Sequence, residues 1–441
     1  MNTPAVRCLV TGSTGYVGSR LIPVLLHRGH QVRAMARTPD KLADVPWHND
    51  VEIAQGDLSD PDTLAAAFDG MDVIYYLAHS MGGGSDDFVA EERKAAENVA
   101  EAAKRAGVGR IVYLSGLHPP DAELSRHLQS RTAVGEVLIA SGIETVVLQA
   151  GVVIGSGSAS FEMIRHLTEV LPVMTTPKWV HNKIQPIAVH DVLHYLAEAA
   201  TAAVPKSRTW DIGGPDVLEY GDMMQIYAQA AGLRRRRMLI LPFLTPTIAS
   251  WWVGLVTPIP SGLARPLVES LHCDAVANEH DIEAYVSPPP EGLTPYRKSV
   301  ELALEHLNRG QFESTWESAT PAGPLPSDPD WSGETVFSDS VSATTSTEPE
   351  KVWDALSNNT HTGRWHVQSS DAKSVMRLRD WGRLPGDAWL DITVSPRTGG
   401  GSDFDQKATL CPHGLAGRAY AMTVWPVRRI LLRQQVSRLL K

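Results

Sequence analysis

Short runs of apolar and β-branched residues alternate with helix-spaced apolar positions along the first 150 residues of the chain. The runs predict strands at 7–11, 31–36, 52–55, 73–77, 110–115 and 145–149. Between them, apolar positions three and four apart predict helices, for instance at 16–28, 62–68, 88–106 and 126–141. Strands that alternate with helices are typical of βαβ units, so we predict an α/β fold with a doubly wound parallel sheet.

After residue 151 the alternation loosens and proline becomes frequent. Helical spacing recurs at 161–171, 188–201, 220–231 and 296–307. We expect these helices to form a smaller lobe, about residues 151–318, which completes a first domain of residues 1–318. The stretch 319–334 holds four prolines and few apolar side chains, so we interpret it as a linker.

The last part, residues 335–441, predicts a separate α+β domain. Alternating positions indicate strands at 335–344, 373–379 and 388–394, and a helix is expected at 348–356. After the glycines of 399–401 we expect a basic amphipathic helix that closes the chain. Its apolar face would carry Ile430, Leu432, Val436 and Leu439 opposite its arginines.

Composition narrows the possible partners. The 441 residues include 43% hydrophobic and 20% charged residues, which is typical of a globular protein. The formal net charge of −10 argues against nucleic acid as the main partner, because phosphate binding needs a dominant positive field. Seven Lys and Arg, without any Asp or Glu, lie in residues 406–441, so the basic excess is concentrated there.

One segment, 238–264, contains no charged residue and follows four consecutive arginines. It is long enough for a membrane span, but four prolines interrupt it. The alternatives are a buried or interface segment, peripheral membrane contact and a pocket for an apolar substrate. This segment and the basic C-terminal helix are therefore the two candidates for membrane contact.

Three isolated cysteines, Cys8, Cys273 and Cys411, indicate neither a disulfide framework nor a zinc site, and no metal site is predicted. The N-terminus lacks a basic and apolar leader. We therefore expect a cytoplasmic protein that is possibly membrane-associated.

A glycine-rich loop joins the first predicted strand to the first predicted helix. It consists of Gly12, Ser13, Thr14, Gly15, Tyr16, Val17 and Gly18. Gly12 permits a tight turn, Gly15 allows the backbone to approach a pyrophosphate, and Gly18 allows close packing of the helix. The N-terminus of the helix would then bind the phosphates.

The GxxGxxG spacing resembles the extended and atypical branches of the short-chain dehydrogenase/reductase superfamily, over about residues 5–310. The resemblance implies a Rossmann-type sheet, a substrate lobe and a bound nicotinamide cofactor. Further cofactor contacts would come from Arg37, Asp57, Leu58, Leu77, Ala78 and His79. Arg37 stands where an acid would mark NAD specificity, which favours NADP(H). Asp57 is either the family's adenine contact or only a helix-capping turn.

Active members of this superfamily use a Ser and a Tyr-x-x-x-Lys pair. Ser115 stands at the serine position, but His127 and Arg131 occupy the places of the Tyr and the Lys. His127 could act as acid and base because imidazole titrates near neutrality. The alternatives are that the two residues contact the cofactor without catalysis, or that they cap and solvate the helix.

The chain is most similar to the atypical subgroup related to NmrA-type regulators and to the NADPH-binding accessory subunit of respiratory complex I. Residues 335–441 resemble the domain of unknown function DUF2867, through LPGDAWL at 384–390 and PHGLAGR at 412–418. That resemblance implies a helix-grip (START-like) fold. The copy lacks a Gly/Trp-rich stretch between Asn359 and Ala372.

Two functions follow from these motifs. The first is an NADP(H)-dependent oxidoreductase for a small hydrophobic substrate, a carbonyl or a quinone-like compound. The second is a redox sensor or assembly factor that binds NADPH without turnover. The missing Tyr and Lys favour the second function, whereas Ser115 and the apolar segment 238–264 favour the first.

Overall fold

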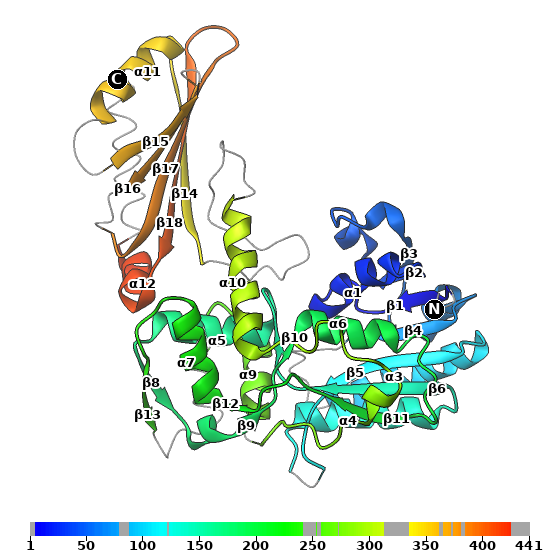
Figure 1. Ribbon diagram of the computed structural model, residues 1–441. Helices are drawn as coiled ribbons and strands as arrows, with labels where there is room; N and C mark the ends of the chain where they lie inside the picture. Colours follow the sequence, from blue (N-terminus) through cyan, green and yellow to red (C-terminus); the bar gives the residue numbers. More distant parts are fainter. Residues whose placement is uncertain are drawn as a thin grey trace. The chain divides into compact units, whose positions relative to one another are not determined.

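A computed structural model describes residues 5–78, 88–120, 123–240, 253, 257–271, 273–312, 335–360, 365–371, 374–380 and 384–424 (Figure 1). The chain divides into two compact units. The first consists mainly of residues 1–308, and the second mainly of residues 334–441. The two units are described separately below.

The first unit is built on a seven-stranded sheet in which every pair of neighbouring strands is parallel. From one edge to the other, its strands are β11 (Arg208–Ile212), β6 (Glu144–Ala150), β5 (Arg110–Gly116), β4 (Val73–Tyr76), β1 (Arg7–Val10), β2 (Gln31–Ala36) and β3 (Glu52–Gln55). This order confirms the predicted doubly wound sheet of the Rossmann type. The edge strand β11 was not predicted.

Helices cover both faces of this sheet (Figure 1). On one face lie α1 (Tyr16–His27) and α6 (Val189–Glu198), whose leucines, isoleucines and valines share a core with the sheet. On the other face lie α2 (Pro61–Phe68), α3 (Phe88–Arg105) and α4 (Arg126–Ala140). Because both faces are buried, the middle residues of the central strands are mostly apolar.

The strand order reverses between β1 and β4, which are neighbours in the sheet. Thr11, just after β1, ties the two strands together at their carboxyl ends. Its Oγ1 donates to the carbonyl of Tyr75 at 3.0 Å and accepts from the amide of Leu77 at 3.0 Å. Ligands of doubly wound sheets bind at such a switch point, so this edge is where a site is expected.

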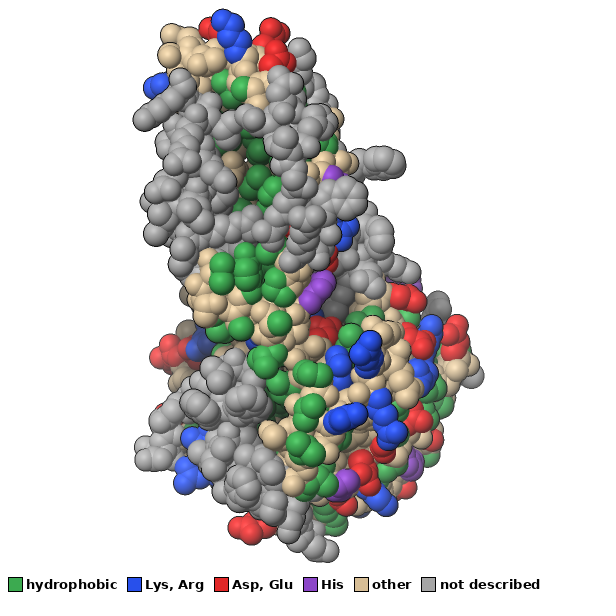
Figure 2. Space-filling model, turned by 90° about the vertical axis from the view of Figure 1, so that its left-hand side faces the viewer, with side chains coloured by type: hydrophobic (Ala, Val, Ile, Leu, Met, Phe, Trp, Pro, Cys, Tyr) green, Lys and Arg blue, Asp and Glu red, His purple; other side chains and the backbone are tan. Residues whose placement is uncertain are grey.

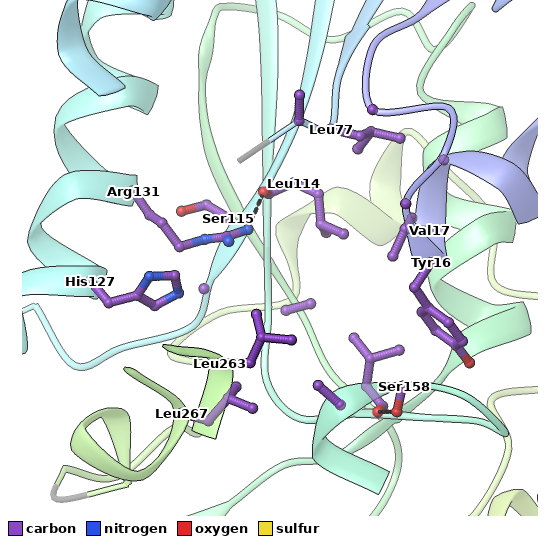
Figure 3. Close-up of a pocket in the computed structure, with 18 of the residues that line it drawn as sticks. Tyr16, Val17, Leu77, Leu114, Ser115, His127, Arg131, Ser158, Leu263 and Leu267 are labelled. Atoms are coloured by element: carbon purple, nitrogen blue, oxygen red, sulfur yellow. Dashed lines mark hydrogen bonds between the residues drawn. The ribbon is translucent and has the colours of Figure 1, made fainter. Parts of the chain in front are cut away.

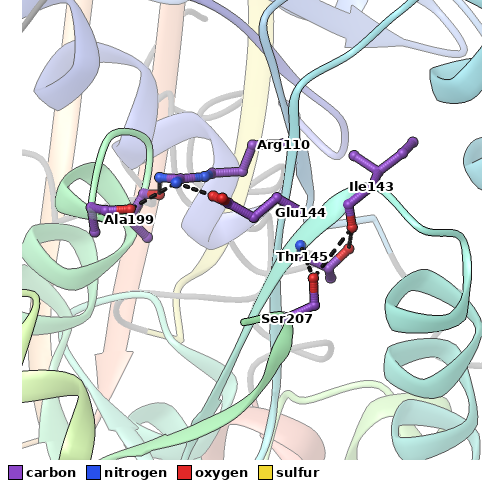
Figure 4. Close-up of polar contacts among 7 residues, drawn as sticks. Arg110, Ile143, Glu144, Thr145, Ala199 and Ser207 are labelled. Carbon is purple, nitrogen blue, oxygen red and sulfur yellow. Dashed lines mark hydrogen bonds and ion pairs between the residues drawn. The ribbon is translucent and has the colours of Figure 1, made fainter. Parts of the chain in front are cut away.

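Polar contacts stabilise the amino-terminal ends of β5 and β6 (Figure 4). The Arg110 guanidinium forms an ion pair with Glu144 and donates to the carbonyl oxygens of Ala199 and Ala202, both at 2.7 Å. A cation at these carbonyls complements the negative end of α6. The amide of Thr145 donates to Ser207 Oγ at 2.9 Å, which holds β11 beside β6.

The lobe of the first unit consists of helices and short strand pairs. Its helices are α5 (Ala159–Val170), α7 (Tyr220–Ala230), α9 (Ser261–Ser270) and α10 (Tyr296–Phe312). Its strand pairs are β7 (Val153–Ile154) with β10 (Ile187–Ala188), β9 (Lys183–Ile184) with β12 (Leu218–Glu219), and β8 (Val173–Thr176) with β13 (Arg237–Ile240). Short 3-10 helices lie at Pro39–Leu42, His48–Asp50, Lys178–His181 and Asp281–Ala284.

Most of the charge-free segment 238–264 lies outside the described residues. Its described parts are the end of β13, Val253 and residues 257–264, which include the start of α9. Among the described helices, none combines the length and the hydropathy that a bilayer crossing requires.

In its described residues, the second unit forms a five-stranded antiparallel sheet with helices α11 and α12. Its strand order is β14 (Phe337–Thr345), β18 (Ser402–Pro412), β17 (Gly386–Pro396), β16 (Val375–Asp380) and β15 (Trp365–Asp371). Val352, Trp353 and Leu356 of α11 (Pro349–Thr360) pack on one face of the sheet. The α+β class of this domain is therefore confirmed.

Between the glycines of 399–401 and the helix expected at the C-terminus lies a strand that was not predicted, β18, and the residues after Val424 lie outside the described part of the chain. The three glycines have φ between 88° and 109° and form a turn that leads directly into β18. In β18 the even-numbered side chains from Ser402 to Leu410 are buried, a period of two that indicates a strand. A helix, α12 (Gly414–Thr423), begins only after β18. Ile430, Leu432, Val436 and Leu439 lie outside the described residues.

Candidate active site

A cavity of about 830 Å³ opens at the carboxyl ends of the central strands of the first unit (Figure 3). The glycine-rich loop forms one wall, and the ends of β2, β4, β5 and β6 form the floor. Helices α4, α5 and α9 contribute side chains to the remaining walls. The cavity therefore lies at the switch point of the sheet.

The loop is shaped by contacts that only glycine allows. Gly12 has φ +66°, and a Cβ there would lie 2.8 Å from backbone atoms of Leu77 and Ala78. The amide of Gly15 donates to the carbonyl of Gly12 at 2.8 Å. A Cβ on Gly18 would lie 2.3 Å from that carbonyl oxygen. The loop is thus packed against both β4 and α1, as the motif predicts.

The N-terminus of α1 faces the cavity without a capping side chain. Gly15 is its N-cap, and no acidic residue lies in the first turn. The loop residues Thr14, Gly15, Tyr16, Val17 and Gly18 all line the cavity. Uncapped amides at the positive end of a helix dipole are the donors that bind phosphate oxygens.

Ser13 has a different role from its neighbours. Its hydroxyl is fully buried and donates to the carbonyl of Met35 at 2.8 Å, so the side chain joins the loop to β2. Ser13 does not line the cavity. The motif alone predicts a cofactor contact for Ser13, because the residue lies inside the glycine-rich loop.

Arg37, Asp57 and Leu58 all line the cavity at the ends of β2 and β3. Arg37 is exposed. Asp57 accepts from the amide of Ser59 at 2.9 Å and so also shapes its own turn. The neighbouring Arg33 points elsewhere: it pairs with Glu52 at 2.8 Å and donates to the carbonyl oxygens of Ala67 and Asp69.

The end of β4 lies beside the loop. Leu77 and Ala78 line the cavity, and their amides both donate to Thr11 Oγ1. His79, the third predicted contact from this strand, lies outside the described residues.

Ser115, His127 and Arg131 are brought together on one wall (Figure 3). Ser115, the penultimate residue of β5, is 3% exposed, and its Oγ has no hydrogen-bond partner among the described residues. Arg131 is 9% exposed and donates through Nη2 to the carbonyl of Leu114 at 2.7 Å. Both α4 residues point toward the cavity, four positions apart on one helix face.

The surroundings of His127 change its chemistry. Burial, followed by the charge of Arg131, lowers the pKa of His127 to about 3. The imidazole is therefore neutral at pH 7 and can donate one hydrogen bond, but it holds no acidic proton. Titration near neutrality, which the residue type alone indicates, is thus wrong for this position.

The far end of the cavity is apolar. Met163 and Ile164 of α5 line it, together with Leu263 and Leu267 of α9 and with Leu271. Figure 3 shows Leu263 and Leu267 pointing into the cavity opposite the glycine-rich loop. Leu263 belongs to the segment 238–264, for which a pocket for an apolar substrate was one of the alternatives, whereas Leu267 and Leu271 were not predicted. Their spacing of four residues was the available signal.

Two carboxylates of α3, Glu91 and Glu92, also line the cavity. Glu92 is 6% exposed. Nothing in the sequence pattern singled them out. In the part of the chain that the structure describes, no group of His, Cys, Asp and Glu side chains is arranged to hold a metal ion.

Comparison with known families divides the chain as its motifs do. Residues 12–160 match the NAD(P)H-binding family. Residues 338–435 match DUF2867, a protein family of unknown function. The first match covers the glycine-rich loop and the wall of Ser115, His127 and Arg131.

Curated relatives match the chain only in part. A 3 beta-hydroxysteroid dehydrogenase/Delta 5-->4-isomerase of Mycobacterium tuberculosis is 43% identical over 124 residues, which are 26% of this chain and 33% of the relative. Cinnamoyl-CoA reductase 2 of Arabidopsis thaliana is 24% identical over 263 residues, 50% of this chain and 76% of the relative. The chain spans about a third of the length of the first curated relatives that it matches.

Solved structures share the fold of the first unit. An NADPH-dependent quinone oxidoreductase of Escherichia coli, complexed with NADPH, has a TM-score of 0.54 at 21% identity and covers 68% of this chain and 99% of its own. The Citrobacter sp. triphenylmethane reductase, complexed with NADP(H), has a TM-score of 0.53 at 19% identity and covers 67% and 99%. At these identities the likeness shows the fold alone.

Proposed function

We propose that this chain, which joins an NAD(P)H-binding domain of the Rossmann type to a DUF2867 domain, is an NADP(H)-dependent reductase of a hydrophobic carbonyl or quinone-like substrate. The observation that carries the proposal is the continuity of the cavity. Its polar end is the glycine-rich loop, and its apolar end is lined by Met163, Ile164 and the leucines of α9. The two ends suit a dinucleotide and an apolar acceptor, respectively.

The residues present fit such a cofactor. Gly12 and Gly18 leave the space that a Cβ would fill, and the first amides of α1 are uncapped toward the cavity. Arg37 would bind the 2′-phosphate of NADP(H), because a guanidinium matches phosphate geometry. Leu77 and Ala78 would flank the nicotinamide ribose. When bound, the cofactor supplies a hydride; the protein supplies position and electrostatics.

The apolar end would hold the acceptor next to the polar wall. Leu263 and Leu267 face this space from α9, and His127 faces it from α4. His127 would donate a hydrogen bond to the oxygen of the acceptor as a neutral imidazole. Ser115 and Arg131 lie deeper in the same wall, so their main role there is electrostatic.

The test is oxidation of NADPH by the full chain in the presence of a panel of carbonyls and quinones. Turnover is expected with apolar ring compounds. A Leu267→Gln variant should raise KM for them and leave the Kd for NADPH unchanged, because Leu267 is far from the glycine-rich loop (Figure 3). The matched control is Leu415→Gln, an exposed leucine of the second unit. Tight NADPH binding without turnover of any compound would overturn the proposal.

A second candidate function is a sensor that binds NADP(H) without turnover. One observation favours it: the wall holds a neutral His127 and a 3% exposed Ser115 in place of a Ser and Tyr-Lys arrangement. A sensor must bind NADP⁺ and NADPH unequally in order to shift an equilibrium between conformations. Calorimetric Kd values for the two forms test this function. Equal affinities would contradict it.

A further inference from the structure

Among the described residues of the polar wall, which are Ser115, His127 and Arg131, none readily gives up a proton at neutral pH. A serine hydroxyl and an arginine guanidinium are both very weak acids in proteins. The pKa of His127 is about 3, so its imidazole is already neutral. A saturated ketone that accepts hydride becomes an alkoxide, a strong base that needs a proton as it forms. This wall is therefore poorly suited to saturated ketones.

The same wall holds a buried positive charge. Arg131 is 9% exposed, and its Nε is buried without a hydrogen-bond partner. Its Nη2 bonds only a neutral acceptor, the carbonyl of Leu114. Among the described residues, no carboxylate lies within ion-pair distance of this guanidinium. A buried cation without a counter-ion is costly unless a ligand compensates it.

The charge of Arg131 already acts on its surroundings. After burial, it is the second cause that lowers the pKa of His127. A field that disfavours a proton on imidazole also favours a negative charge on a neighbouring oxygen. Glu91 and Glu92 of α3 also line the cavity. Arg131 lowers the pKa of Tyr113 and Glu92 raises it, so an anion would be stabilised beside Arg131 and destabilised beside the carboxylates.

Resting on the proposed reductase function, we infer that the acceptor is a conjugated carbonyl, a quinone or an α,β-unsaturated ketone, and that Arg131 stabilises the anion formed from it. The hydride carries its electron pair from C4 of the dihydronicotinamide to the acceptor and forms a new bond there. The conjugated π electrons move onto the carbonyl oxygen. The nicotinamide is oxidised, and the resulting phenolate or enolate takes its proton from water afterwards.

Binding of para-nitrophenol to the full chain loaded with NADP⁺ tests the anion site without turnover. The phenolate absorbs in the visible range, so titration of the bound compound reports its pKa. The expected result is a pKa below that of the free phenol. The downward shift of the phenol pKa should be lost in Arg131→Met and largely kept in Arg131→Lys. Thermal unfolding of both variants shows whether their fold is intact. Arg105→Met, an exposed arginine on α3, is the matched control.

A bound phenol with an unchanged or raised pKa would overturn the inference. An equal downward shift in Arg131→Met would do the same, because the charge of Arg131 would then be irrelevant.

Turnover supplies the second arm of the test. A quinone or an enone should be reduced at least about 100-fold faster than a saturated ketone of the same ring size, the usual contribution of a general acid. The solvent isotope effect on this step should be close to one, since no proton moves with the hydride.

Equal rates for the two classes, or loss of all turnover in Glu92→Gln, would contradict the inference. A lowered phenol pKa without turnover of any acceptor would contradict the reductase function but support the anion site.

Discussion

We propose that the choice between NADP(H) and NAD(H) depends on Arg37. It is exposed, lines the cavity at the end of β2, and stands where an acid would repel a 2′-phosphate. We expect Arg37→Ala to raise the Kd for NADPH about tenfold to a hundredfold, since a charge-assisted hydrogen bond contributes about 1.5–3 kcal/mol. The Kd for NADH, which lacks that phosphate, should change little. Calorimetric titration measures both.

The matched control for this prediction lies on the same strand. Arg33 pairs with Glu52 and does not line the cavity. Arg33→Ala should leave the ratio of the two Kd values unchanged. Equal losses of NADPH and NADH affinity in Arg37→Ala would show that Arg37 does not bind the 2′-phosphate.

His127 makes the stability of the first unit depend on pH. Its pKa is about 3 in the folded chain, below the ordinary value of 6.5, so the unfolded chain binds a proton that the folded chain rejects. Above pH 6.5 the imidazole is neutral in both states, so His127 does not reduce the free energy of unfolding. As the pH falls from 6.5 toward 3, the free energy of unfolding decreases. Between pH 7 and 5 this decrease is about 2 kcal/mol.

The comparison with His127→Gln isolates this effect, because glutamine does not titrate. Denaturant unfolding at pH 7 and pH 5 should show a larger decline for the wild type than for the variant. An identical decline in both would place the folded pKa of His127 near its ordinary value.

Motif residues could be predicted from the sequence, but their environment could not. Gly12, Gly15 and Gly18 are fixed by a local turn, so their spacing is enough to find them. The leucines of α9 reach the cavity only through the packing of the lobe, more than 100 residues from the loop. The neutral state of His127 depends on burial, which its residue type does not reveal.

At the scale of elements, the packing of α1 against the loop can be tested directly. A Cβ on Gly18 would lie 2.3 Å from the backbone oxygen of Gly12, and backbone cannot move aside cheaply. We expect Gly18→Ala to cost about 1–3 kcal/mol of unfolding free energy and to weaken NADPH binding. Thermal unfolding and calorimetry measure the two effects.

Gly135 on α4 provides the control, since it is also a helical glycine. A Cβ there would meet only side chains, the nearest at an ordinary 3.6 Å. Gly135→Ala should be neutral or stabilising, because alanine is the better helix former. If Gly18→Ala and Gly135→Ala have the same effect on stability, the close approach of α1 to the loop is not the reason why residue 18 must be glycine.

The predictable elements share strong local patterns. The six predicted strands of the sheet and the four helices between them all occur in the structure, with ends shifted by at most a residue or two. The missed strands β11 and β18 mix polar and apolar residues. β11 pairs with the distant β6, and β18 pairs with the distant β14 as well as with its neighbour in the chain, β17. Long-range pairing outweighs weak local preference in such strands.

At the scale of the whole molecule, a basic and apolar patch on β8, β13 and the residues before β13 is a candidate for membrane contact. The patch consists of the exposed side chains Val173, Arg234, Arg235, Arg237, Leu239 and Ile240. Figure 2 views the side on which β8 and β13 lie in Figure 1, and hydrophobic side chains gather there. Arginines beside aliphatic side chains suit an anionic bilayer surface.

We therefore expect the chain to sediment with vesicles that contain phosphatidylserine and not with neutral vesicles. Each basic residue contributes about 1 kcal/mol, so replacing all three arginines of the patch with glutamine should weaken binding about a hundredfold. Replacing Arg428, Arg429 and Arg433 instead tests the basic C-terminal stretch, the second candidate. Equal binding to anionic and neutral vesicles would rule out both.

The central claim is that one cavity holds NADPH and an apolar acceptor and passes a hydride between them. A single-turnover experiment tests this most directly: the full chain, loaded with one equivalent of NADPH, is mixed rapidly with excess quinone. The account predicts that the dihydronicotinamide absorbance disappears in one exponential phase, and that Leu267→Gln slows this phase while Leu415→Gln does not. NADPH that stays bound and reduced in the presence of the quinone would contradict it.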